Sequence, residues 1–247
     1  MNEDTRETGA ERLRRNRSFV IRTTRMSPHQ KEAYERLSPA FRIPVSDAST
    51  DRLDWKIVFP HRTAPGGDGR PLVMDIGFGM GGELAELAAK RRDTDFLGVE
   101  VHKPGVGKLL SHIERLGLEN VRVVRYDAVV VCERLVPERS LDGIHLFFPD
   151  PWPKKRHNKR RLVRDGFPEL VAPLLKERGY LYAVTDWEEY AYQMLDVLTR
   201  CPLLVNRYDG FADPQPWRPQ TAFERKGLKQ GHRIFEVLFE RPAEIRA

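Results

Sequence analysis

The sequence predicts an α/β fold: a mostly parallel sheet of seven strands with an antiparallel last strand, and helices on both faces. Two observations support this prediction. From Pro71 onward, short apolar runs alternate with segments of helical periodicity, the order expected for successive strand–helix units. The runs are also too uniformly apolar to face water, as is typical of strands in a parallel sheet that helices cover on both sides.

The N-terminal region precedes this pattern and differs from it. Residues 1 to about 26 are polar and arginine-rich without a periodic apolar face, so we expect an arm that orders on a polyanion. A merely solubilising tail is the alternative. Ser27 and Pro28 predict the start of a short helix that ends near Leu37, because serine is a common N-cap and proline is favoured at the first helical position. A glycine-rich loop at 65–69 follows.

The predicted organisation is a basic, partly disordered N-terminal arm, residues 1–50, followed by one α/β domain, residues 51–247. A helix from about Trp187 to Leu198 follows the fifth strand. The last two β-rich runs have no clear crossover helix between them, which favours an antiparallel final pair. In chain order the expected strands are PLVMDIG, DFLGVEV, VRVVRYDA, LDGIHLFF, YLYAVT, LLVNRY and HRIFEVLFE.

Composition and charge indicate which kind of binding partner and which cellular compartment to expect. The net charge of +6 is concentrated in two clusters, Arg12–Arg25 and Lys154–Arg164, which favours a nucleic acid over other anions. Cys132 and Cys201 lie far apart without a CxxC pair, so we expect no disulfide framework and no metal site. No run approaches the roughly 18 apolar residues of a membrane span, and no signal peptide is evident, so a cytoplasmic protein without a membrane anchor is expected.

A glycine-rich turn after the first strand predicts a cofactor site. Gly77, Gly79, Gly81 and Gly82 follow Asp75 and lead directly into a helix. Glycines let the backbone turn sharply and approach a ligand where any Cβ would collide. The pattern alone also fits dinucleotide-binding proteins, and packing of the helix on the sheet is a second alternative.

Acidic residues at the strand ends favour one cofactor class. Asp75, Glu100 and Asp127 lie at or near the ends of the first three strands, where ligands bind in such sheets. A carboxylate at Asp75 would repel a pyrophosphate but attract the ammonium and sulfonium charges of S-adenosylmethionine. Glu100 can accept from ribose hydroxyls and Asp127 from an adenine amino group. For Asp127, a helix cap is the alternative.

The fourth strand ends in a proline-rich loop that predicts a substrate site. Pro149 and Pro151 disfavour helical backbone at the residues before them, which holds the Asp150 carboxylate on a stiff extended turn. A polar group there would meet a base edge, and Trp152 would stack on a base face. A simple strand-to-helix loop is the alternative.

A basic run follows this loop at once. The segment Lys154–Arg161 combines six lysines and arginines with His157 and Asn158 and has no acid. Its position beside the Asp150 loop favours a contact with a substrate's phosphate backbone, although a solvated helix face is the usual reason for such runs. His157 is expected to be a neutral donor rather than an acid–base catalyst.

Five segments carry a resemblance to a known family. DIGFGMGGELAELA, FLGVEVHKPGVGKLL, FFPDPWPKKRHNKRRL, TDWEEYA and RPQTAFERKGLKQGHRIFEVLF, in this order and spacing, resemble the bacterial tRNA (guanine-N7-)-methyltransferases. The match covers residues 50 to 241. It implies a Rossmann-like class I methyltransferase fold and transfer of a methyl group from S-adenosylmethionine to N7 of a guanine in the variable loop of tRNA.

The resemblance also implies roles for individual residues. Asp150 is the implied catalytic residue. The implied cofactor contacts are Asp75, Glu100, Asp127 and Asp150, which join Gly77 and Gly79 of the glycine-rich turn in the expected cofactor site. The implied tRNA contacts are Lys154, Arg156, His157, Asn158, Lys159, Arg160, Arg161, Asp186, Thr221, Ala222, Phe223 and Glu224. Two positions depart from the family: Asp75 stands where glutamate is common, and Pro153 stands where histidine is often found.

Structural alternatives remain open for the later residues. Thr221 and Glu224 fit a reciprocal capping box, and Asp186 fits a simple N-cap of the next helix. Rival functions are a methyltransferase of the same fold that acts on other RNA or on protein, an RNA-binding protein without catalysis, and a nicotinamide oxidoreductase. The intact acids at Asp75, Glu100, Asp127 and Asp150 argue against loss of catalysis. No obligatory protein partner is evident.

Overall fold

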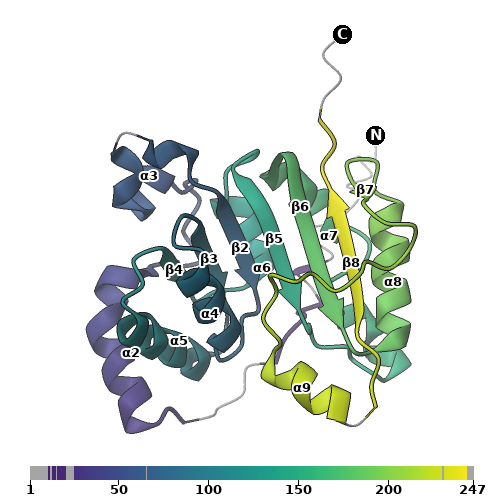
Figure 1. Ribbon diagram of the computed structural model, residues 1–247, viewed down its shortest axis with the longest axis horizontal. Helices are drawn as coiled ribbons and strands as arrows, with labels where there is room; N and C mark the ends of the chain where they lie inside the picture. Colours follow the sequence, from purple (N-terminus) through teal and green to yellow (C-terminus); the bar gives the residue numbers. More distant parts are fainter. Residues whose placement is uncertain are drawn as a thin grey trace, which may run out of the picture.

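The computed structural model describes residues 11, 13–14, 16–20, 25–64, 66–229 and 231–243, and they form one sheet with helices on both faces (Figure 1). The sheet has the strand order β1-β4-β3-β2-β5-β6-β8-β7. The pairs from β1 to β6 are parallel, and β8 runs antiparallel to both of its neighbours. The predicted parallel sheet with an antiparallel end is thus confirmed, with one more strand than expected.

The strands are short and mostly buried along their whole length, as the apolar runs predicted. β2 and β3, at the centre, have no exposed position. The bounds are β1 (Arg42–Ile43), β2 (Leu72–Ile76), β3 (Asp95–Val99), β4 (Val121–Val124), β5 (Leu141–Phe147), β6 (Leu175–Thr185), β7 (Val205–Asn206) and β8 (Phe235–Glu240).

Helices alternate with the strands and cover the two faces separately (Figure 1). One face carries α2 (Pro28–Phe41), α4 (Gly82–Lys90) and α5 (Lys103–Leu116), and the other carries α6 (Ala128–Val130), α7 (Phe167–Val171) and α8 (Glu188–Thr199). The short helices α3 (Trp55–Val58) and α9 (Ala222–Lys229) lie at opposite ends of the strands. None of the helices in the described ranges is both long and apolar enough to cross a membrane.

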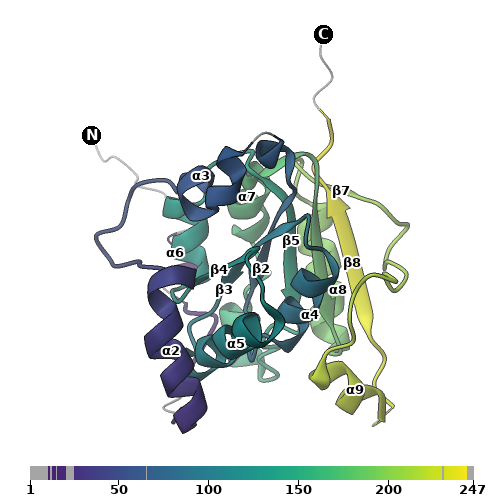
Figure 2. The ribbon, with the colours of Figure 1, turned by 60° about the vertical axis from the view of Figure 1, so that its left-hand side comes forward.

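The first strand belongs to the region that the sequence assigned to the arm. β1 pairs in parallel with β4, and α2 packs beside α5 (Figure 2). α2 begins where predicted, with a capping box between Ser27 and Gln30, but it continues through Pro39 to Phe41. Leu37 and Phe41 pack against the apolar cluster beneath α5, and this contact offsets the hydrogen bond that proline removes. Pro28–Ile43 therefore belongs to the folded α/β structure, with α2 packed on α5 and β1 paired with β4.

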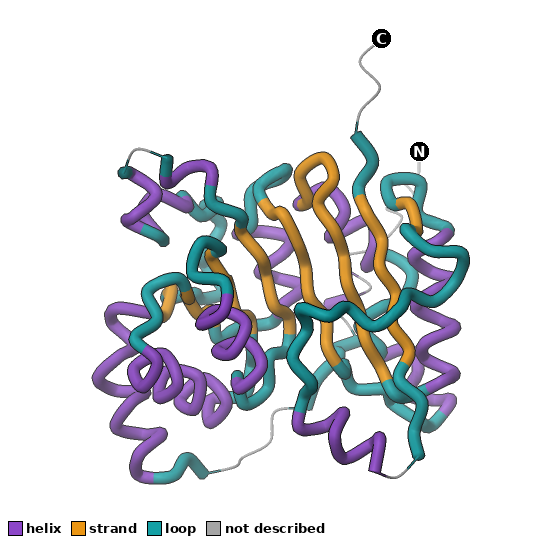
Figure 3. The backbone as a smooth tube through the Cα atoms, in the orientation of Figure 1, coloured by secondary structure: helices purple, strands orange, loops and turns teal. Residues whose placement is uncertain are grey.

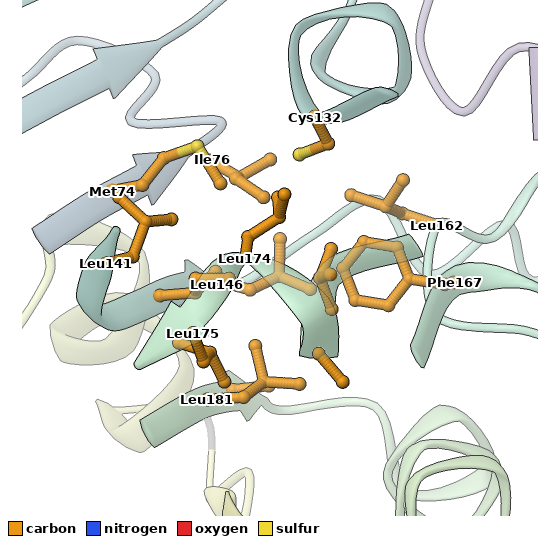
Figure 4. Close-up of a cluster of buried hydrophobic side chains, with 14 of the residues drawn as sticks. Met74, Ile76, Cys132, Leu141, Leu146, Leu162, Phe167, Leu174, Leu175 and Leu181 are labelled. Atoms are coloured by element: carbon orange, nitrogen blue, oxygen red, sulfur yellow. The ribbon is translucent and has the colours of Figure 1, made fainter. Parts of the chain in front are cut away.

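Two apolar layers hold the sheet between the helices. The larger layer lies under α6, α7 and α8, and Figure 4 shows part of it, where Met74, Ile76 and Leu146 from the sheet meet Leu162 and Phe167. On the other face, the long segment between β7 and α9 crosses in front of β8, β6 and β5 (Figure 3). Its Trp217 stacks on His145 of β5 with ring centroids 5.3 Å apart.

Candidate active site

The carboxyl ends of β2, β3 and β5 open into one cavity of about 380 Å³, a volume within the usual range for small-molecule sites. In such sheets ligands bind where neighbouring connections leave the strands toward opposite faces. Of the residues that the sequence predicted for the site, Gly77, Gly79, Glu100, Asp150 and Thr221 line this cavity.

The glycine-rich turn forms one wall of the cavity. Gly77 and Gly79 have φ values of +74° and +58°, a region that side chains with a Cβ rarely adopt. A Cβ built at either position meets no heavy atom within 4 Å outside its chain neighbours. The two glycines thus leave open space beside the backbone, as a cradle for a closely approaching ligand requires.

Glu100 is held at the end of β3 by three backbone donors. Gly79 donates to Oε2 at 2.9 Å, and Val101 and His102 donate to Oε1 at 2.6 and 2.9 Å. Burial raises the pKa of this carboxyl, while the hydrogen bonds from His102, Gly79 and Val101 lower it in part. Each carboxylate oxygen can accept more than one hydrogen bond, so the fixed group can still receive ribose hydroxyls.

Asp75 lies at the same edge of the sheet but deeper. Its side chain is buried, and burial raises the pKa of its carboxyl to about 8, with further contributions from the negative charges of Glu83 and Glu100. Each of these causes disfavours the ionised form. A cationic group in the adjacent cavity would reverse that balance, so the position fits the ammonium of S-adenosylmethionine better than a pyrophosphate.

Asp127 caps a helix, which was the alternative for this residue. Its side chain accepts from the Val129 N–H at 2.9 Å and so begins α6. Burial raises the pKa of its carboxyl, while that hydrogen bond and the charges of Arg17 and Arg14 lower it. Its neighbours Tyr126 and Ala128 line the cavity, whereas Asp127 itself does not.

The loop after β5, which carries Asp150, has an unusual backbone conformation at two other residues. Phe148 and Trp152 have φ values of +51° and +46°, although neither is glycine. Such conformations cost about 1 to 3 kcal/mol each and persist where the surroundings impose them. Asp150, between them, is exposed and faces the cavity together with Phe148 and Pro149.

The N-terminal segment closes one side of the cavity, which the sequence did not predict. Ser18 and Phe19 line the cavity, and Leu13 is buried in the larger core. Trp152 donates from Nε1 to the Ser18 carbonyl at 3.2 Å. Isolated apolar residues within an arginine-rich stretch were the only signal for this docking. The first ten residues of the expected arm lie outside the described residues.

Arg160 ties the same segment to the basic run. Its Nε and Nη2 donate to the carbonyls of Arg17 and Phe19 at 3.1 and 2.9 Å. Its guanidinium lies 3.8 Å from the centroid of the Trp152 ring. One face of that ring is therefore covered by Arg160, so it does not stand open on both sides for base stacking.

The other residues of the basic run differ in how far their side chains are exposed to solvent. Residues Lys155–Arg160 form a 3₁₀ helix, η4, and Lys154, Arg156 and Lys159 are exposed. Asn158 donates to Glu189 of α8 at 3.1 Å. Desolvation and then the charges of its basic neighbours lower the pKa of His157, which agrees with a neutral imidazole. Arg161, by contrast, is buried.

The later candidates make contacts within the protein. Asp186 Oδ2 lies 3.2 Å from His232 Nδ1, within hydrogen-bond distance. Asp186 does not cap α8, because the N-cap of that helix is Trp187. Thr221 and Glu224 form the capping box, since each side chain accepts from the other residue's N–H, at 2.9 and 3.3 Å. Glu224 also binds Arg218 and is buried. The side chains of Ala222 and Phe223 lie outside the described part of the chain.

Comparisons with known proteins agree with this geometry. Residues 69–237 match the family described as "Putative methyltransferase". The chain is 49% identical over 241 residues to the tRNA (guanine-N(7)-)-methyltransferase of Ralstonia nicotianae, covering 98% of this chain and 92% of that protein. It is 43% identical over 235 residues to the protein of the same name from Methylobacillus flagellatus, covering 94% of this chain and 95% of the relative.

Among solved structures, TrmN from Thermus thermophilus resembles this chain with a TM-score of 0.51 at 18% identity. The match covers 75% of this chain and 48% of that one. At this level of identity the likeness concerns the fold alone.

Proposed function

Because the chain belongs to the tRNA (guanine-N7-)-methyltransferase family, we infer that it transfers a methyl group from S-adenosylmethionine to N7 of a guanine in tRNA. The target that the family resemblance implies is a guanine of the variable loop. The observation that carries this function is the cavity itself. The glycine turn, Glu100 and Asp150 line one cavity, and a basic run begins four residues beyond Asp150.

The residues at the ends of β2 and β3 are proposed to hold the cofactor. Glu100 would accept from the ribose hydroxyls, and Gly77 and Gly79 would let the backbone lie against the ligand. Asp75 would face the ammonium group, and Asp127 the adenine amino group through its remaining acceptor capacity. When bound, S-adenosylmethionine supplies an electrophilic methyl carbon on a positively charged sulfur.

Asp150 is proposed to orient the base. Guanine N7 has an in-plane lone pair and no proton, so the chain needs no general base there. The Asp150 carboxylate would accept from the guanine N1–H and amino group and stabilise the positive charge that develops on the base. Alignment of the reacting atoms within about 3.5 Å accounts for a large share of such rate accelerations, on the order of 7 kcal/mol or more.

Three basic residues are proposed to hold the tRNA backbone. Lys154, Arg156 and Lys159 are exposed beside the Asp150 loop, as phosphate contacts must be. His157, Asn158, Asp186 and Thr221 are proposed to meet the same substrate. A cytoplasmic location, and activity without a protein partner, stay predictions.

The direct test is to map the methylated nucleotide. Incubating the protein with labelled S-adenosylmethionine and bulk tRNA is expected to place the label in 7-methylguanosine of the variable loop. Label in ribosomal RNA or in protein instead would move the chain to another substrate class. Label at another atom of guanine would overturn the assignment to N7.

A further inference from the structure

Arg161 follows the exposed basic run in sequence but not in environment. Its side chain is 1% exposed, whereas Lys154, Arg156 and Lys159 are exposed to solvent. Lysine and arginine side chains are almost never fully buried without partners. The buried guanidinium of Arg161 is therefore expected to bind other groups of the protein.

The guanidinium of Arg161 joins the Asp150 loop to α8. Its Nε donates to the Pro151 carbonyl at 2.7 Å. Its Nη1 donates to Gln193 Oε1 at 2.7 Å and to Glu189 Oε1 at 3.3 Å. It also lies over the Tyr190 ring, 5.0 Å from the centroid. One planar group thus donates in two directions, to the loop on one side and to the helix on the other.

The loop needs such a contact because of its own composition. Pro149 and Pro151 have no N–H, so they cannot hold the loop with backbone donors. Phe148 and Trp152 hold positive φ values that an unrestrained chain would leave. The Pro151 carbonyl, one residue after Asp150, is the group that Arg161 binds.

The α8 residues that Arg161 contacts are held in place by further hydrogen bonds. The Val163 N–H donates to the Tyr190 hydroxyl at 3.0 Å, and Gln193 Nε2 donates to the Val163 carbonyl at 2.9 Å. α8 therefore holds the backbone just after Arg161 and its guanidinium together. This arrangement leaves the side chain directed into the protein.

We propose that Arg161 is a positioning residue, which sets the Asp150 carboxylate by holding the Pro151 carbonyl against α8, and that it makes no contact with RNA. The proposal rests on the proposed role of Asp150 in methyl transfer. It removes Arg161 from the expected tRNA contacts and gives α8 a part in aligning the base.

A conservative variant separates the two roles. Arg161→Lys keeps the positive charge, so a phosphate contact would survive, but a single ammonium cannot reproduce the planar donation to Pro151 and Gln193. We expect its single-turnover methylation rate at saturating tRNA to fall about 100-fold, the scale of an ångström-sized misplacement. The tRNA Kd and its salt dependence are expected to stay near those of the wild type.

Gln193→Leu tests the same contact without changing Arg161. It removes the charge-assisted hydrogen bond from Arg161 and the donation from Gln193 to the Val163 carbonyl, two of the contacts that hold Arg161 on α8, so a loss of about tenfold in the single-turnover rate is expected. Arg200→Gln, which removes an exposed arginine at the other end of α8, is the matched control and is expected to change neither the rate nor the tRNA Kd.

Hydrogen exchange over residues 148–160 gives a readout that does not depend on the methylation target. It is expected to be faster in Arg161→Lys and Gln193→Leu than in the wild type. Unchanged exchange and rate in both variants would overturn the proposal. So would a salt slope reduced by about one in Arg161→Gln at an unchanged saturating rate, which would identify a phosphate contact. A wild type that forms no 7-methylguanosine contradicts the proposed function instead, and the exchange measurement still decides the role of Arg161.

Discussion

The Asp75 carboxyl combines deep burial with a pKa raised to about 8, mainly by desolvation and then by the charges of Glu83 and Glu100. Because its ordinary value is 3.8, the folded protein binds a proton there between about pH 4 and pH 8 that the unfolded chain releases. The contribution of Asp75 to stability therefore decreases as pH rises through this window.

The affinity for the cofactor is expected to depend on pH in the opposite sense to the stability contribution of Asp75. An ammonium beside Asp75 favours the ionised carboxylate, so S-adenosylmethionine affinity should increase from about pH 6 to pH 8 with release of a proton. It should fall again above about pH 8, where an α-amino group loses its charge. Calorimetry in two buffers of different ionisation enthalpy measures the proton release. Asp75→Asn should abolish it, and a variant with unchanged proton release would place the proton elsewhere.

Asp150→Asn should separate chemistry from binding. The substitution keeps the size of the side chain but removes its charge and replaces one acceptor oxygen with a donor. We expect methyl transfer to fall about 100-fold or more, the scale for loss of one electrostatic group at a reacting centre. The tRNA Kd should change much less. Single-turnover kinetics measure the rate, and near-wild-type methylation by the folded variant would show that the backbone positions the base without this carboxylate.

At the scale of elements, η4 and its N-cap residue Lys154 carry the exposed cations that are proposed to bind tRNA. Replacing Lys154, Arg156 and Lys159 together with glutamine should weaken tRNA binding and reduce the slope of log K against log salt concentration by up to about three. Cofactor affinity should stay near normal. The matched control replaces Arg178, Arg200 and Arg207, exposed arginines that lie away from the Asp150 loop. An equal loss in both triple variants would indicate an effect of net charge alone.

The start of α9 is held by a buried charge cluster. Arg218 donates to both Glu224 oxygens at 2.5 and 2.8 Å and to Glu236 at 2.7 Å, and Tyr182 donates to Glu236. Arg218→Met would leave two buried carboxylates without their cation. We expect a loss of about 3 to 5 kcal/mol in the free energy of unfolding, measured by denaturant titration.

The control for this change lies on α9 itself. Arg225 is exposed and donates to the Gln220 carbonyl, so Arg225→Met should cost less than about 1 kcal/mol. If the two variants lost equal stability, the cluster around Arg218 would contribute no more than a surface hydrogen bond.

At the scale of the whole molecule, the cavity proposed to hold the cofactor joins segments from distant parts of the chain, from Ser18 to Thr221. A ligand that binds only the folded state stabilises it by about 2.7 kcal/mol at a concentration 100 times its Kd. For a chain of this size that corresponds to a rise in Tm of about 5 to 10 °C.

Thermal denaturation with S-adenosylmethionine measures this shift. Asp150→Asn should keep most of it, because the proposed cofactor contacts at Glu100 and the glycine turn remain. Glu100→Ala should lose much of it at the same ligand concentration, since the N–H groups of Gly79, Val101 and His102 lose their acceptor and the ribose loses the partner proposed for it. A full shift in Glu100→Ala would remove Glu100 from the site.

The sequence by itself determined the features that depend on local pattern. The alternating apolar runs predicted the strands and their mostly parallel pairing, and the glycines after Asp75 predicted the turn at the end of β2. The cavity that Gly77, Glu100 and Asp150 line lies where the strand ends indicated. These inferences hold because turn geometry and periodicity are written within a few neighbouring residues.

Only the tertiary structure decided which charged residues face solvent. Arg156, Arg160 and Arg161 are alike in the sequence, but Arg160 binds the carbonyls of the N-terminal segment, and Arg161 is buried against α8, which lies about thirty residues later. Leu13 docks in the core although its neighbours are polar. A side chain's burial depends on segments far away in the chain, and no pattern of nearest neighbours records which segment will cover it.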